Sequence, residues 1–101
     1  MNEHLEQRLQ QIARLAIAEH SAWVERNAAK EAYRDWLTNF RSETGEDFCF
    51  EVDFEQLEPE GKKDYQSIVY RKNMAQRKLG TARAATRRAI KKAGTSNEPT
   101  P

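Results

Sequence analysis

The sequence predicts an all-α protein in which two long antiparallel helices form a coiled-coil-like helical hairpin. Apolar residues recur at steps of three and four through 2–41 and again through 58–93, the spacing that places them on one face of a helix. The first stretch contains neither glycine nor proline. A connector, 42–57, joins the two stretches, and helices of similar length joined in this way pack most simply as an antiparallel hairpin.

Length and composition predict one domain with a thin core. The 101 residues allow a single domain, which we place at 1–94, followed by a polar tail, 95–101, that we expect to be disordered. The chain is 38% hydrophobic and 33% charged, which suits an elongated helical protein with a narrow apolar seam. A homodimer would add buried surface to such a thin core.

The first predicted helix, 2–41, concentrates its aromatic residues toward its C-terminal half. Tyr33, Trp36 and Phe40 follow one another at helical spacing, so the thick end of the core is expected there. Aromatic residues spaced in this way are typical of a packed core rather than of a ligand platform. Acidic and basic residues are mixed over the same helix, which indicates a solvated outer face.

The connector combines a helix stop with an alternating aromatic pattern. Gly45 is the expected left-handed residue after the first helix. From Phe48 to Phe54 apolar residues alternate with Cys49 and acids, a period of two that predicts a short extended segment. We expect this segment to lie across the helix ends as a lid; the alternatives are pairing with the same segment of a second copy or with a partner's sheet. The spacing of Asp53 and Gln56 also fits a capping box followed by a short helical turn.

The second predicted helix, 58–93, is rich in alanine and in basic residues. Pro59 suits its first turn, and Gly94 is expected to end it. Gly80 interrupts the pattern at a cost of about 1 kcal/mol relative to alanine, which suggests a bend or a close helix approach. The predicted packing stripe consists of Ile68, Ala75, Leu79, Ala82, Thr86, Ala89 and Ile90.

The net charge of +1 conceals a segregated charge distribution. Residues 42–61 contain eight acids and no base, whereas 71–92 contain nine bases and no acid. In a hairpin the acidic connector lies at the turn, roughly 30 Å from residues 83–92 at 1.5 Å per helical residue. That distance is several Debye lengths at physiological salt, so the connector of one copy does not neutralise the basic end.

The basic stretch leads to the first functional hypothesis, a non-enzymatic protein that contacts the backbone of DNA or RNA without base specificity. An exposed helix can gain stability by mixing Glu with Lys at four-residue spacing, and this stretch does not do so. Such a face has two interpretations: long solvated helices often carry many Lys and Arg, which help solubility, whereas a face without acids also suits phosphate or an acidic protein surface as its partner. The candidate binding residues are Arg77, Lys78, Arg83, Arg87, Arg88, Lys91 and Lys92.

The alternative hypothesis is a small protein-binding inhibitor or adaptor that docks on a nucleic-acid-processing complex. Small helical chains with segregated charge and no catalytic site are common among phage and mobile-element proteins. The acidic connector, through Glu51, Asp53 and Glu55, is the candidate partner surface because its carboxylates would mimic phosphates. A purely structural homodimer is a third possibility.

Catalytic and cofactor signatures are absent from the sequence. His4 and His20 lie sixteen residues apart with no positioned nucleophile, and Cys49 is the only cysteine. We find no zinc spacing, calcium loop or glycine-rich phosphate loop, and we therefore predict no enzyme activity, metal or cofactor. The polar N-terminus and the lack of a long apolar stretch predict a cytoplasmic protein without a membrane segment.

Overall fold

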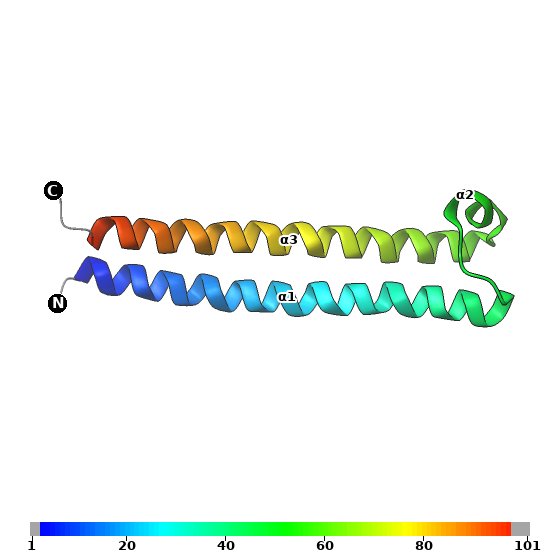
Figure 1. The fold of residues 1–101 in the computed structure, drawn as a ribbon, viewed down its shortest axis with the longest axis horizontal. Coiled ribbons are helices and arrows are strands. Elements are labelled where there is room, and N and C mark those ends of the chain that lie inside the picture. The colour runs from blue at the N-terminus through cyan, green and yellow to red at the C-terminus, as the bar shows by residue number, and fades with distance from the viewer. Residues whose placement is uncertain (1–2, 98–101) are drawn as a thin grey trace. The chain divides into compact units, whose positions relative to one another are not determined.

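The computed structural model describes residues 3–97, which form two long helices and a short helical connector (Figure 1). Helix α1 covers Glu3–Thr44 and α3 covers Pro59–Asn97; between them lie α2, Phe50–Asp53, and one turn of 3-10 helix, η1, Phe54–Gln56. Helices α1 and α3 pack against each other as a helical hairpin, and residues 3–97 contain no strand. The predicted fold class is confirmed.

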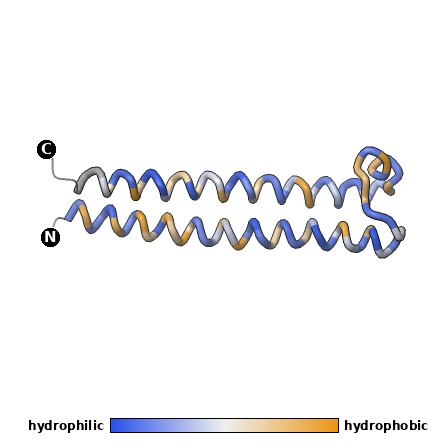
Figure 2. Tube along the Cα trace, in the orientation of Figure 1, coloured by the Kyte–Doolittle hydropathy of each residue, from blue (hydrophilic) through white to orange (hydrophobic). Residues whose placement is uncertain are grey.

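The contacts divide the hairpin into two compact units, which we describe separately. The connector unit is Glu25–Gln76 and includes α2 and η1. The terminal unit comprises Met1–Val24 and Arg77–Pro101, of which residues 3–24 and 77–97 are described. Hydrophobic and hydrophilic residues alternate along both long helices (Figure 2).

Buried and half-buried residues follow steps of three and four in both units, which is the spacing of a coiled-coil seam. In the terminal unit the seam consists of Leu5, Arg8, Ile12, Leu15, Glu19 and Ala22 on α1, and of Leu79, Ala82, Thr86, Ala89 and Ala93 on α3. In the connector unit it consists of Arg26, Ala29, Tyr33, Trp36 and Phe40 on α1, and of Tyr65, Ile68, Lys72 and Ala75 on α3.

Polar seam residues of the connector unit have partners across the helix pair. Arg26 donates through Nη1 to Oε1 of Gln76 at 3.3 Å. The Lys72 ammonium lies 4.4 Å from the centroid of the Tyr33 ring, within cation–π range. Long polar side chains therefore lie in the seam without leaving buried side-chain nitrogen or oxygen atoms unsatisfied among the described residues.

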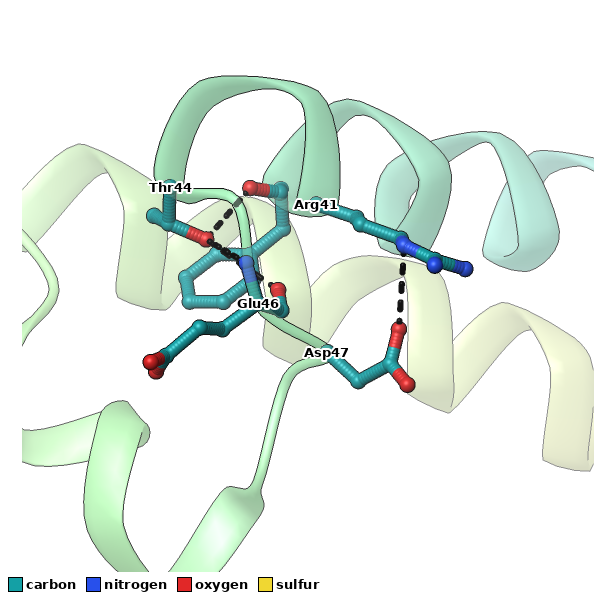
Figure 3. A network of polar contacts seen from close by, with 5 residues as sticks. Arg41, Thr44, Glu46 and Asp47 are labelled. Carbon is teal, nitrogen blue, oxygen red and sulfur yellow. Dashed lines mark hydrogen bonds and ion pairs between the residues drawn. The ribbon is translucent and has the colours of Figure 1, made fainter.

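Helix α1 ends at the predicted stop, three residues beyond the predicted helix (Figure 3). Gly45 has a φ of +80° and donates its N–H to the carbonyl of Arg41 at 2.7 Å, as a left-handed C-terminal residue does. The Thr44 hydroxyl donates to the Phe40 carbonyl at 2.8 Å. The Nε atom of Arg41 lies 3.6 Å from Oδ1 of Asp47. Both side chains are exposed, so this ion pair adds little stability.

The prediction of an extended segment from Phe48 to Phe54 is wrong over most of its length. Cys49 has extended angles, φ −116° and ψ 110°, but the chain is helical from Phe50 to Gln56. A lone strand would leave its backbone N–H and carbonyl groups without partners, whereas a helical turn pairs them within the segment. The Asp53 carboxylate accepts a hydrogen bond from the Cys49 N–H, and the Asp53 N–H donates to the Cys49 carbonyl, both at 2.7 Å. The predicted Asp53 cap of the following turn is not formed.

The connector nevertheless covers the aromatic end of the hairpin as the lid interpretation predicted. The Phe48 ring centroid lies 4.9 Å from that of Trp36 and 5.0 Å from that of Phe40. Phe50 and Phe54, four residues apart on one side of the helical turn, both contact Tyr65, and Phe54 is buried. These aromatic contacts make the thick end of the core.

Helix α3 begins at Pro59, as predicted, but it does not end at Gly94. The helix continues to Asn97, because Gly94 keeps a helical conformation, and residues 98–101 of the predicted tail lie outside the described part. Gly80 is also helical, and a Cβ added there would meet no atom within 4 Å, so no neighbouring helix approaches closely. Ile90 is 53% exposed and was wrongly placed in the seam, where Ala93 follows Ala89 instead.

Candidate functional site

The terminal unit has a strong excess of positive charge. Its described residues include nine Lys and Arg against three Asp and Glu. All seven basic residues singled out in the sequence lie on its α3 segment. Arg83 is half-buried and the other six are exposed. This unit therefore presents the cationic surface that the basic stretch predicted.

Basic side chains lie on both sides of the seam of α3. At about 100° per residue, Arg83 and Arg87 fall on one side of the seam, and Arg88 and Lys92 fall on the other. Arg77 and Lys91 lie on the outer surface between these two flanks. The structure thus separates the basic stretch into two flanks that different ligand groups would contact.

One flank forms a groove together with α1. The groove has a volume of about 380 Å³, and its residues come from both helices of the terminal unit. Leu15, Ala85 and Ala89 contribute apolar side chains to it. Its polar lining consists of Arg8, Gln11, Arg88 and Lys92. The short alanine side chains leave room between the helices, while the long cationic side chains extend from both of them.

Arg8 and Gln11 are site residues that the sequence argument missed. Both belong to α1, whose mixed charge had been interpreted as a solvated outer face. The sequence did contain information that could have identified Arg8, because pairing the two seams in antiparallel register places residue 8 beside residue 92. Gln11 also lines an adjoining hollow of about 560 Å³, together with Gln7, Gln10, Arg14 and Leu15.

The groove has the chemistry of an anion site. Guanidinium groups bind phosphate oxygens through two parallel N–H donors, and a lysine ammonium adds a compact positive charge. The Gln11 amide supplies a further donor. No Asp or Glu is among the residues that line the groove. Among residues 3–97 no group of three or more His, Cys, Asp and Glu side chains is placed to hold a metal ion.

The three acids proposed as an alternative partner surface have different local roles. Asp53 binds the backbone of Cys49, and Glu55 pairs with Lys62 at 3.4 Å. Glu51 is exposed; its own backbone N–H, and then the Cys49 thiol, lower the pKa of its carboxyl group. Each of the three carboxylates therefore has a contact within the connector unit.

The two histidines do not come together with a nucleophile in a common site. His20 stacks on Trp23, with ring centroids 5.7 Å apart, on an exposed side of α1. His4 lies near the other end of the same helical segment and is also exposed. Within the described part, no helix is long and apolar enough to cross a membrane.

Fold and site together define a helical hairpin with a cationic groove at its terminal unit. Comparison with protein-family models, with curated proteins and with solved structures gave no match.

Proposed function

We propose that this protein binds the sugar-phosphate backbone of nucleic acid through its terminal unit, without base specificity. The observation that supports this most directly is the groove that Arg8, Arg88 and Lys92 line from two helices, together with Gln11 and apolar side chains. The other basic residues of α3 surround it with positive charge. Such a surface attracts a polyanion over a length of several phosphates.

The absence of aromatic rings from the groove supports recognition of the backbone rather than of the bases. Proteins that hold single strands by their bases use aromatic side chains as stacking surfaces, and the residues that line this groove include none. Arg and Lys contacts to phosphates release condensed counterions, so affinity falls as the salt concentration rises. Backbone contacts of this kind carry no direct sequence information.

The groove is tested by changing Arg8, Arg88 and Lys92 to glutamine and titrating labelled DNA and RNA by fluorescence anisotropy. Each phosphate contact contributes about −0.7 to −0.9 to the slope of log affinity against log salt, so the triple variant is expected to reduce the slope by about 2 to 3. Its affinity at low salt is expected to fall by roughly tenfold to hundredfold. Measurements at about 50 and 200 mM salt supply the slope.

A matched variant distinguishes the effect of the groove residues on affinity from the effect of the protein's net charge. Lys30, Arg34 and Lys63 are exposed basic residues of the connector unit, and their change to glutamine removes the same charge elsewhere. We expect this control to bind within about threefold of the wild-type protein. Changing Arg83 and Arg87 to glutamine tests the other flank. Equal losses in all three variants would contradict a role for the groove, and no salt-sensitive binding by the intact protein would overturn the proposal.

A second candidate function, protein binding through the connector, is favoured by one observation. Phe50 and Val52 are 53% and 58% exposed within the acidic stretch, an arrangement suited to a partner that is both apolar and basic. Here the connector would be the binding surface of an inhibitor or adaptor.

The double change Glu51→Gln and Glu55→Gln distinguishes the two functions while keeping the structural Asp53 contact intact. If the groove binds nucleic acid, removing these acids should leave affinity unchanged or raise it by a few-fold, because repulsion of the polyanion decreases. Anisotropy at low salt measures this. A variant that binds nucleic acid normally but no longer acts in cells would favour the protein-partner function instead.

A further inference from the structure

The cationic groove of the terminal unit has an apolar lining that phosphate binding does not use. Leu15, Ala85 and Ala89 line the groove and are only half-buried, so part of each side chain is in contact with water. Phosphate groups pair with the cations of the groove but leave these side chains without an apolar partner. An occupant that matches the whole groove therefore carries carboxylates next to an apolar side chain.

The connector carries a surface of this composition. Glu51, Val52 and Glu55 are all exposed, Val52 by 58%. At roughly 100 to 120° per residue through α2 and η1, these three positions fall within a sector of about 100°. The centre of this sector lies about 100° around the turn from the buried Phe54. We call Glu51, Val52 and Glu55 the connector ridge.

We propose that the connector ridge of one copy of this chain binds the cationic groove of another copy. Val52 covers the apolar lining between the two helices, while Glu51 and Glu55 pair with the cations on either side of it. Carboxylates and guanidinium groups form charge-assisted hydrogen bonds, often through two parallel N–H donors. The ridge thus matches both the charge and the apolar lining of the groove.

The carboxylates of the connector ridge can accept further cations. Glu55 already pairs with Lys62 at 3.4 Å, but its side chain is 86% exposed. Glu51 accepts a hydrogen bond from the Cys49 thiol and is also exposed. An ionised carboxylate has about four acceptor positions, so one such contact leaves room for a guanidinium or an ammonium group.

The ridge that enters a groove belongs to a different molecule, because the connector is held within its own unit. The Phe48 ring lies 4.9 Å from that of Trp36, and the Phe54 ring lies 5.8 Å from that of Tyr65. No residue that lines the groove belongs to this connector unit. A connector that left the aromatic cluster would lose the packing of several rings.

The contact also regulates the groove, a consequence that rests on the nucleic-acid binding proposed above. Ridge carboxylates and backbone phosphates then compete for the same cations. A polymer that neutralises several cations at once releases many counterions and displaces the ridge. Self-association would therefore keep the groove covered only while nucleic acid is scarce. The association of two copies does not itself depend on nucleic-acid binding.

A charge swap in the full chain, without nucleic acid, tests the contact. The ridge variant carries Glu51→Lys and Glu55→Lys, and the groove variant carries Arg88→Glu and Lys92→Glu; all four positions are exposed. Each variant alone brings like charges together. An equimolar mixture restores opposite charges, both between the two unchanged surfaces and between the two reversed ones.

Sedimentation equilibrium at about 50 mM salt measures the association. The wild-type protein is expected to associate with a dissociation constant of about 100 µM. Each variant alone should associate at least tenfold more weakly, and their mixture should return to within about threefold of the wild-type constant. Val52→Ala should weaken association by about threefold to tenfold without a change of charge, because it removes apolar surface from the contact.

The matched control is Arg77→Glu with Arg87→Glu, which changes the charge of the same unit by the same amount at exposed residues that do not line the groove. It should weaken association by less than about threefold. A wild-type protein that remains monomeric at about 1 mM overturns the proposal. So does a mixture that associates no better than its components, or a control as weak as the groove variant. A failure of nucleic-acid binding alone would not produce any of these results.

Discussion

The Tyr65→Ala variant is expected to lower the free energy of unfolding by about 3 kcal/mol, near the lower end of the range for truncating a packed aromatic side chain. Tyr65 is the centre of the aromatic cluster in the connector unit. Its ring centroid lies 4.9 Å from those of Trp36 and Phe48 and within 6 Å of those of Phe50 and Phe54. Truncation would therefore remove packing from α1, α2 and η1 together. Urea unfolding monitored by circular dichroism measures the loss.

Tyr65→Phe is the matched control, because it keeps the ring and removes the hydroxyl. We expect it to change stability at neutral pH by less than about 1 kcal/mol. A loss equal to that of Tyr65→Ala would show that the hydroxyl, rather than the ring contacts, supports the cluster. If neither variant loses stability, the connector does not pack on α3 in solution.

The stability of the wild-type protein is expected to depend on alkaline pH more strongly than that of Tyr65→Phe. Burial, and then the nearby Tyr33 and Glu51, raise the pKa of Tyr65 above its ordinary value of 10.0. The folded state therefore holds the phenol proton more tightly than the unfolded state, and this stabilising contribution is complete below pH 10 and is lost as pH rises through the folded pKa. Unfolding midpoints measured across this range should fall more in the wild-type protein than in Tyr65→Phe.

The Leu79→Ala variant is expected to lower the free energy of unfolding by about 2 to 5 kcal/mol, the range for leucine truncation in protein cores. Leu79 has 0% relative exposure and is the largest fully buried side chain described. The seam of the terminal unit contains small residues such as Ala22 and Ala82, so few neighbours are long enough to fill the space that truncation would leave. A loss near the upper end would indicate that the helices do not move together to close the cavity.

Ile90→Ala is the control for Leu79, since it removes an aliphatic side chain from the same helix. Ile90 is 53% exposed, and surface substitutions of this kind usually change stability by less than about 0.5 kcal/mol. Thermal and urea unfolding of both variants would measure the difference. If Ile90→Ala were as destabilising as Leu79→Ala, the sequence-based packing stripe would be correct and the seam through Ala93 would be wrong.

These stability tests also decide how the binding experiments are interpreted. The groove is formed by side chains from two helices, so a variant that separates them would weaken binding without touching a phosphate. The glutamine variants of Arg8, Arg88 and Lys92 keep long polar side chains, and their unfolding should resemble that of the wild-type protein. A binding loss accompanied by normal unfolding is therefore assigned to charge rather than to the fold.

Several features follow from the sequence because their causes are local. The three-and-four spacing of apolar residues predicts helices from neighbouring positions, and Gly45 predicts the end of α1 because it adopts a left-handed backbone angle more easily than other residues do. The separation of acids from bases is likewise a property of the chain order. The hairpin follows from two such helices and a short connection.

The tertiary structure decided the features that depend on which residues meet across the helices. The alternation from Phe48 to Phe54 indicated an extended segment, but internal hydrogen bonds and packing on Tyr65 favour a helical turn. Arg8 joined the site because the antiparallel register places it at a groove with Lys92, and spacing along one helix carries no information about that pairing. The sequence thus determined the helices and their charge, whereas the contacts between helices determined the groove.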